Sequence, residues 1–565
     1  MSFLRRRRYE PPPPVVHVSV SMARQSDPFA AYWRARALNP VYRRSIYLGM
    51  DAVGPRYGAD DTNVLVVAPS RSVAGKTTSA VIPNVITWMG PVVSTSTKGD
   101  AYVASAMVRS ALGTVWHYNI DGGRVQRGAK RLCFSFVEAC AGDWETTLKV
   151  VDQIVGSTAH GATSDNAQFF RDRARTLGAV LFYAAFVLKK GRESWVVKQV
   201  RREDTEALSR LMVQLKEKGH AHQADMLLSV VGTDARQRSG IFGTLAAAFK
   251  AYESEAVLAS TEDHNFHAAT FVQGMPFAHN KNLILPPDIE ATFDLASQPV
   301  GRFDTIYLTA SEQEVVAPIV NGFLTFLRIK AAEAYEEARE DYPDTEPPRV
   351  LFALDELATM ANLPDLPAQL AKGGVGTLTL GIFQTMSQAR DRWGHELGMG
   401  MLSLFQNIAY YPGSRDKETI ELLTYLAGEL DRERWTQSDS KTNQFMSPGS
   451  TTSGVSQHFD RVSRLPPDVI ASGRQDNPYG VLLFPHGSSR HEWLHATPHY
   501  MATPWPELII AEARKVLAAR DSYRLSLPFP TLERDGQLHR EISREAAMLY
   551  WPTKSAWPTA KKIAS

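Results

Sequence analysis

The sequence predicts an α/β fold that carries a phosphate-binding loop and is interrupted by an all-helical segment. Three observations lead to this prediction. The apolar stretch Asn63–Ala68 is followed closely by Gly-Lys-Thr at the start of a helix, the apolar stretch Val350–Leu354 ends in Asp355 and Glu356, and helical periodicity without strands separates the two. Apolar runs of this kind are typical of parallel strands that are covered on both faces.

Length and composition restrict the class of protein. A chain of 565 residues is too long for one hydrophobic core, so we expect two or three domains. With 62 basic and 60 acidic residues, any nucleic-acid surface must be local. Cys133 and Cys140 are the only cysteines, which excludes a disulfide framework or a Cys-rich zinc site and favours a reducing compartment. No apolar run is long enough for a membrane span, so we expect a cytoplasmic protein.

The order of the predicted elements gives the domain plan. Residues 1–48 form a basic, proline-rich arm and linker, in which Arg5–Arg8 and Pro11–Pro14 follow each other without the apolar core of a secretory signal. This arm has the charge to contact anionic lipid or a phosphate backbone; a solvated tail is the alternative. Residues 49–142 and 260–505 form the nucleotide-binding domain, residues 143–259 the all-α insertion, and residues 506–565 a C-terminal helix and tail.

Individual segments follow from periodicity and turn residues. Helices are expected over residues 80–88, 167–188, 203–228, 241–258, 315–340 and 507–520. Strands are expected over residues 63–68, 91–95, 303–308, 350–354, 377–383 and 408–411, with 480–484 as the last strand. The polar stretch 436–454 is expected to be a mobile loop.

The strand–helix junction after Ala68 has the composition of a phosphate loop. The predicted nucleotide-binding residues are Ser70, Arg71, Ser72, Val73, Ala74, Gly75, Lys76, Thr77 and Thr78. Backbone N–H groups of such a loop and the following helix N-terminus attract phosphate, Lys76 would reach the β- and γ-phosphates of ATP, and Thr77 would bind Mg²⁺. Ser70 stands where a glycine is usual, and a chance Gly-Lys-Thr at a helix start is the alternative.

Asp355 and Glu356 are the candidate acidic half of the site. A carboxylate at the end of a buried strand can hold Mg²⁺ together with Thr77, which is the role predicted for Asp355. The next residue, Glu356, is the candidate general base for the attacking water. Gln384, at the end of the strand 377–383, is a third candidate catalytic residue beside Lys76 and Glu356, because a glutamine orients water in other P-loop enzymes. An ordinary acidic helix cap and an ordinary polar strand end are the alternatives.

Several stretches resemble the coupling-protein ATPases of type IV secretion and conjugation (TraG/TraD-like). They are APSRSVAGKTTSAVIPNVITWMG, NAQFFRDRARTL, LFALDELATMANLPDLPAQLAKGGVGTLTLGIFQTMSQ and VSRLPPDVIASG. They occur in the family's order between Val64 and about His499.

The resemblance implies a hexameric, RecA-like motor. Such a motor uses ATP and Mg²⁺ to move single-stranded DNA with its relaxase toward the proteins of a secretion channel. Lys76 and Thr77 carry over as phosphate and Mg²⁺ residues, Asp355 as the Mg²⁺ ligand and Glu356 as the base. The helical insertion would receive the DNA–protein substrate, and an arginine from a neighbouring subunit is expected at the site, with Lys372 and Arg415 as unresolved candidates. For base stacking, Tyr118, Trp144 and Trp195 are available, with core packing as the alternative.

Two departures keep other functions open. Val73 and Ala74 lengthen or shift the loop relative to the family's Ser-Gly-Lys. The two N-terminal membrane helices of many members are not seen, so the protein would reach the membrane peripherally, through a partner or through its Arg5–Arg8 arm, or not at all. One alternative is an FtsK/HerA-like cytoplasmic motor on double-stranded DNA. The other is a non-hydrolysing adaptor that docks substrates on an ATPase fold.

Overall fold

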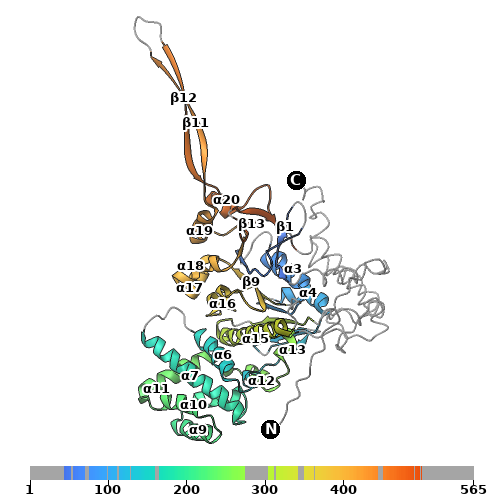
Figure 1. Cartoon of the computed structure of the whole chain (residues 1–565), viewed down its shortest axis with the longest axis vertical. Helices are drawn as coiled ribbons and strands as arrows, with labels where there is room; N and C mark the ends of the chain where they lie inside the picture. Colours follow the sequence, from blue (N-terminus) through green and yellow to red (C-terminus); the bar gives the residue numbers. More distant parts are fainter. Residues whose placement is uncertain are drawn as a thin grey trace, which may run out of the picture.

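A computed structural model gives the fold (Figure 1). It describes residues 44–51, 55–69, 75–97, 99–110, 113–121, 123–126, 129–158, 165–273, 303–310, 313–341, 349–361, 363–442, 450–488, 490–496 and 498. Most of the predicted basic arm, the loop residues Ser70–Ala74 and the predicted helix 507–520 therefore lie outside the described residues.

A large mixed β-sheet forms the body. Within the described residues its twelve strands run in the order β2-β1-β14-β13-β10-β3-β9-β8-β4-β7-β5-β6. The strands from β10 to β6 are parallel to their neighbours, and β13, β14, β1 and β2 add antiparallel pairs at the other side. Their bounds are β1 Tyr47–Met50, β2 Pro55–Tyr57, β3 Val64–Val67, β4 Val92–Ser96, β5 Val115–Asn119, β6 Lys130–Arg131, β7 Thr305–Thr309, β8 Val350–Leu354, β9 Thr377–Phe383, β10 Asn407–Tyr410, β13 Gly480–Phe484 and β14 Glu492–His495.

Both faces of the sheet are covered, which explains the continuous apolar strands. In β3, Leu65 and Val67 point into one core, and Val64 and Val66 point into the other. The helices against the second core are α3 (Ile82–Thr87) and α4 (Asp100–Ser110), and those near the first include α15 (Gln313–Asp341), α16 (Leu366–Ala371), α17 (Met386–Trp393) and α18 (His395–Leu404). The prediction of a parallel, doubly covered sheet is confirmed.

Helices alone make up the described chain from Phe136 to Gln273. They are α5 Phe136–Cys140, α6 Trp144–Gly156, α7 Asp165–Val187, α8 Glu193–Arg202, α9 Thr205–Glu217, α10 Ala221–Val231, α11 Ala235–Ala248, the 3₁₀ turn η3 Lys250–Glu253, α12 Glu255–Glu262 and α13 Ala268–Gln273. Two predicted helices are each divided. The one expected over 203–228 is divided at Gly219, whose φ of +88° ends α9, and the one over 241–258 is interrupted by η3.

Helix α15 connects the sheet to these helices, since it packs against both α6 and α13. Among the described residues it is the one helix whose length and composition would suffice to cross a membrane, but 78% of its apolar window is buried inside the protein. A buried core helix meets the same criterion, and the position of α15 between the layers accounts for its apolar character.

Two predictions about the C-terminal part are wrong. The described residues of 436–454 are not a mobile loop, because they belong to a long antiparallel ribbon of β11 (Glu429–Thr442) and β12 (Ser450–Ser463) that projects from the body above α19 (Lys417–Ala427) and α20 (Pro467–Ser472) (Figure 1). The strand 480–484 is not the last, because β14 follows and pairs with β13. The ribbon was missed because backbone pairing forms it without the apolar alternation that burial requires.

Candidate functional site

The candidate site lies at the carboxyl edge of the parallel strands. Strand β3 leads to the Lys76 segment and β8 leads to Asp355, with β9 between these two strands. Because parallel strands end at the same edge, this order brings the lysine segment and the acidic pair together across the end of β9.

Gly75 opens the helical segment after the loop, with a φ of +70° that favours glycine. A Cβ atom on Gly75 would lie 2.5 Å from the hydroxyl of Thr78, and the Gly75 carbonyl accepts hydrogen bonds from Ser79 N and Thr78 Oγ1. The helix starts as a π-helical turn, η2 (Thr77–Val81), and continues as α3, where Pro83 occupies the first turn. Proline lacks the N–H that a helix interior requires, so a helix that restarts here accommodates it.

Lys76 is the centre of a buried ionic cluster. Its Nζ lies 3.1 Å from Glu356 Oε1 and 3.4 Å from Asp355 Oδ1, and it donates a hydrogen bond to the Asp355 carbonyl at 3.2 Å. The Lys76 side chain is 10% exposed, Asp355 7% and Glu356 19%. Among the described residues, one ammonium therefore faces two carboxylates, which leaves one negative charge without a matching described cation.

Thr77 completes the cluster from the next position of the helix. Its hydroxyl donates a hydrogen bond to Asp355 Oδ2 at 2.7 Å. The other carboxylate oxygen, Asp355 Oδ1, is buried and receives no hydrogen bond from any described residue. A buried carboxylate oxygen of this kind, beside a hydroxyl and an uncompensated negative charge, fits the oxygen-rich coordination that Mg²⁺ prefers.

Gln384 follows β9 at the same edge. Its backbone N–H donates to Gln388 Oε1 at 2.9 Å, and the preceding Phe383 carbonyl accepts from Ala68 N, at the end of β3. On the other side, Leu357 N donates to the Ile382 carbonyl of β9. Gln384 thus lies between the lysine and acidic segments, but no hydrogen bond joins its side chain to either within the described residues.

A polar network beside Gln384 was not predicted. Ser387 Oγ donates to Asp416 and Glu418, and Arg390 pairs with Glu418 at 2.6 Å. Partial burial acts to raise the pKa of Asp416, but hydrogen bonds from Thr419 and Ser387 outweigh it and lower that pKa below its usual value. Polar residues that follow β9 and β10, two strands that end at the same sheet edge on either side of β3, were the signal that could have revealed this network.

The sequence offered two candidates for the basic residue that a neighbouring subunit would supply, called the arginine finger. They lie at opposite edges of the sheet. Arg415 follows β10, so it lies at the carboxyl edge with the Lys76 cluster, and it is exposed. Lys372 ends α16 and precedes β9, so it lies toward the amino edge of the sheet. Of the three aromatic residues considered for stacking, Tyr118 is buried against Phe323, whereas Trp144 and Trp195 are partly buried.

Comparisons with known proteins identify the family. A model of type IV secretory system conjugative DNA transfer proteins matches residues 33–274, and a model of the TraM recognition site of TraD and TraG matches residues 349–473. Together the two matches cover more than half of the chain. The chain belongs to the type IV conjugative coupling proteins. A search of curated proteins finds no match.

Solved structures of another coupling protein share the fold. The bacterial conjugative coupling protein TrwBdeltaN70, in its unbound monoclinic form, is 14% identical with a TM-score of 0.52, covering 79% of this chain and 88% of that chain. The plasmid coupling protein TrwB in complex with the non-hydrolysable GTP analogue GDPNP is 13% identical with a TM-score of 0.50, covering 77% and 85%. TrwB with ADP and Mg²⁺ is 14% identical with a TM-score of 0.48, covering 81% and 91%. The first similarity confirms a coupling-protein fold, a RecA-like α/β domain with an all-α domain.

Proposed function

We propose that this coupling protein is a Mg²⁺-dependent ATPase that moves single-stranded DNA, with its bound relaxase, to a type IV secretion or conjugation channel. The observation that carries the proposal is the cluster of Lys76, Thr77, Asp355 and Glu356, which joins two distant segments of the chain at one sheet edge. Membership of the family supplies the DNA-transfer context.

The residues of the cluster have separate roles in this proposal. Lys76 would leave the two carboxylates and bind the β- and γ-phosphates, which need a positive partner in the same buried space. Thr77 and Asp355 would hold Mg²⁺, whose positive charge compensates Asp355 once Lys76 has moved. The bound Mg²⁺ would stabilise the charge that develops on the phosphate oxygens.

Glu356 would act as the general base. Its carboxylate is nearly buried and would be released from Lys76 when the lysine binds phosphate, leaving it free to accept a proton from water. Gln384 follows β9, which lies between β3 and β8, and this place suits a residue that orients the attacking water. The loop residues Ser70, Arg71, Ser72, Val73, Ala74, Gly75 and Thr78 would supply the backbone groups around the phosphates.

The site would be completed by a second subunit in a homo-hexameric ring. Arg415 is the candidate finger, because it is exposed at the same sheet edge as Lys76 and has the planar guanidinium that this role requires. Lys372 is a poorer candidate, because it lies toward the amino edge of the sheet and has no guanidinium group. We further propose a cytoplasmic protein that contacts the membrane peripherally, with the Arg5–Arg8 arm as a candidate contact.

An ATPase assay tests the proposal. Lys76→Ala and Glu356→Gln should each lower the turnover number about 100-fold or more, since each removes a group that acts on the reacting phosphate or water. Glu356→Gln should keep nucleotide binding, because Lys76 and Thr77 remain. If the wild-type protein with DNA hydrolyses ATP no faster than these variants, the non-hydrolysing adaptor is the better account.

A second assay separates the two motors. ATP hydrolysis is measured with single-stranded and with double-stranded DNA across a salt series, because phosphate contacts weaken as salt rises. The coupling function predicts stronger stimulation by single strands at every salt concentration. A preference for duplex DNA would favour the FtsK/HerA-like alternative.

A further inference from the structure

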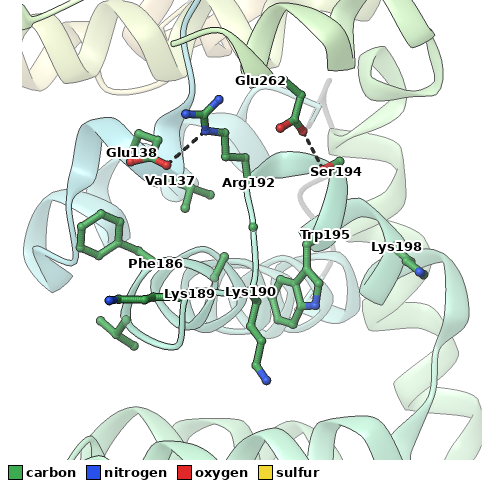
Figure 2. A pocket seen from close by; sticks show the side chains of 13 residues that line it. Val137, Glu138, Phe186, Lys189, Lys190, Arg192, Ser194, Trp195, Lys198 and Glu262 are labelled. Atoms are coloured by element: carbon green, nitrogen blue, oxygen red, sulfur yellow. Dashed lines mark hydrogen bonds and ion pairs between the residues drawn. The ribbon is translucent and has the colours of Figure 1, made fainter.

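A second cavity lies among the helices, away from the Lys76 cluster. Its volume is about 820 Å³, and it is bounded by α5, the end of α7, the turn into α8 and the end of α12 (Figure 2). This volume is in the range of pockets that bind ligands. The turn reverses sharply, since Lys189 has a φ of +52° and Gly191 a φ of +131°. Lys190 N donates to the Ala185 carbonyl at 2.8 Å, which fixes the turn at the end of α7.

The wall of this cavity carries an excess of positive charge. Four basic residues line it, and one of them, Arg192, pairs with Glu138 at 3.1 Å. The other three, Lys189, Lys190 and Lys198, are exposed and form no ion pair with any described residue. Their ammonium groups are free to bind an anionic ligand.

Part of the lining of the cavity is apolar. Phe186 and Trp195 are partly buried and line it together with Val137 (Figure 2). The Trp195 ring lies beside the Lys190 side chain in the same view. An apolar ligand group packed on Trp195 would therefore lie beside Lys190.

Two carboxylates that line the cavity favour a peptide ligand over a nucleic-acid strand. Glu138 is engaged by Arg192, and Glu262 accepts a hydrogen bond from Ser194 at 2.8 Å. A nucleic-acid strand carries a charge at every phosphate and would bring some of them beside these carboxylates. A peptide can alternate carboxylates with apolar side chains, so its charges can meet the lysines while its apolar groups cover Trp195 and Phe186.

We propose that this cavity binds an acidic peptide segment of a partner protein, in which glutamate or aspartate alternates with large apolar residues. The carboxylates bind Lys189, Lys190 and Lys198, and the apolar side chains pack on Trp195 and Phe186. The inference rests on the proposed recruitment of protein partners, and it specifies the chemistry of the segment that is recognised.

Fluorescence anisotropy with the full-length protein tests this proposal. The probes are fluorescein-labelled peptides in which glutamate alternates with leucine and phenylalanine, the same peptides with glutamine in place of glutamate, and a labelled oligothymidylate. The acidic peptides should bind, the glutamine peptides should bind at least tenfold more weakly, and added salt should weaken the difference.

Charge-reversal variants locate the binding. Lys189→Glu/Lys190→Glu/Lys198→Glu and Trp195→Ala should each weaken the acidic peptides at least tenfold, whereas Trp195→Phe should retain most of the affinity. The matched control, Lys149→Glu/Lys218→Glu, reverses exposed lysines elsewhere on these helices and should leave binding unchanged. Thermal unfolding of each variant shows whether the fold is kept.

Three results would overturn the proposal. They are no binding of the acidic peptides, equal loss in the control variant, and oligothymidylate that competes for the cavity with higher affinity than the peptides. The assay contains no nucleotide, so a wild-type protein without ATPase activity that still binds the peptides would sink the proposed motor and leave this inference standing.

Discussion

At the residue scale, the buried ionic groups have different consequences. Lys76 pairs with both Asp355 and Glu356, so these two carboxylates share one cation before any ligand binds. Glu193 pairs with no described cation. It is fully buried, its Oε1 accepts hydrogen bonds from Phe136 N and Val137 N at 2.5 and 3.2 Å, and burial raises its pKa from 4.5 to about 7.

This raised pKa predicts a pH dependence of stability. The unfolded state loses the Glu193 proton near pH 4.5 and the folded state near pH 7, so the free energy of unfolding falls as pH rises between these values. The free energy of unfolding falls by about 3 kcal/mol at most over this range, because each pH unit between the two pKa values contributes about 1.4 kcal/mol. Glu193→Gln should flatten this fall, as measured by urea unfolding across the same pH range.

The control for this prediction is Glu217→Gln, which changes an exposed carboxyl in the same helical region. It should leave the pH profile of the wild type unchanged. An identical profile for Glu193→Gln and the wild type would contradict the assignment of the fall to Glu193.

At the element scale, sequence patterns were reliable where burial decides the structure. Strands β8, β9 and β13 match the predicted residues because each is an apolar run in the core. The approach of Asp355 to Lys76 could be expected from the shared sheet edge, but not the hydrogen bond from Thr77, which depends on side-chain packing. The exposed edge strand β2 and the β11–β12 ribbon were not predicted, because their pairing leaves little apolar pattern. Strand β1 was not predicted although Tyr47 and Leu48 are buried, because its four residues are too few to show a period.

The ribbon should contribute little to the stability of the body. Trp435, Val455 and Phe459 share one face by register and are 62, 62 and 63% exposed, so they bury little surface. Replacing residues 430–462 by a short Gly-Ser turn should change the melting temperature of the protein by less than about 2 °C. Differential scanning fluorimetry of the wild type and this variant is the measurement. A drop of many degrees would show that the ribbon packs on the body.

At the scale of the whole molecule, the two proposed binding sites and the ribbon occupy different places. The proposed ATP site lies at one edge of the sheet, the basic cavity lies among the helices, and the ribbon projects beyond α19 at the far end of the molecule from α7–α11 (Figure 1). The network of Ser387, Arg390, Asp416 and Glu418 joins α17, which follows Gln384, to α19 at the base of the ribbon.

The most direct test of the proposed motor is a structure of the protein with a non-hydrolysable ATP analogue, Mg²⁺ and single-stranded DNA. We predict a ring in which Lys76 has left Glu356 for the phosphates, Thr77 and Asp355 hold Mg²⁺, and Arg415 of the neighbouring subunit approaches the γ-phosphate. Nucleotide bound elsewhere, or a Lys76 side chain still paired with Asp355 and Glu356 while nucleotide is present, would contradict this account.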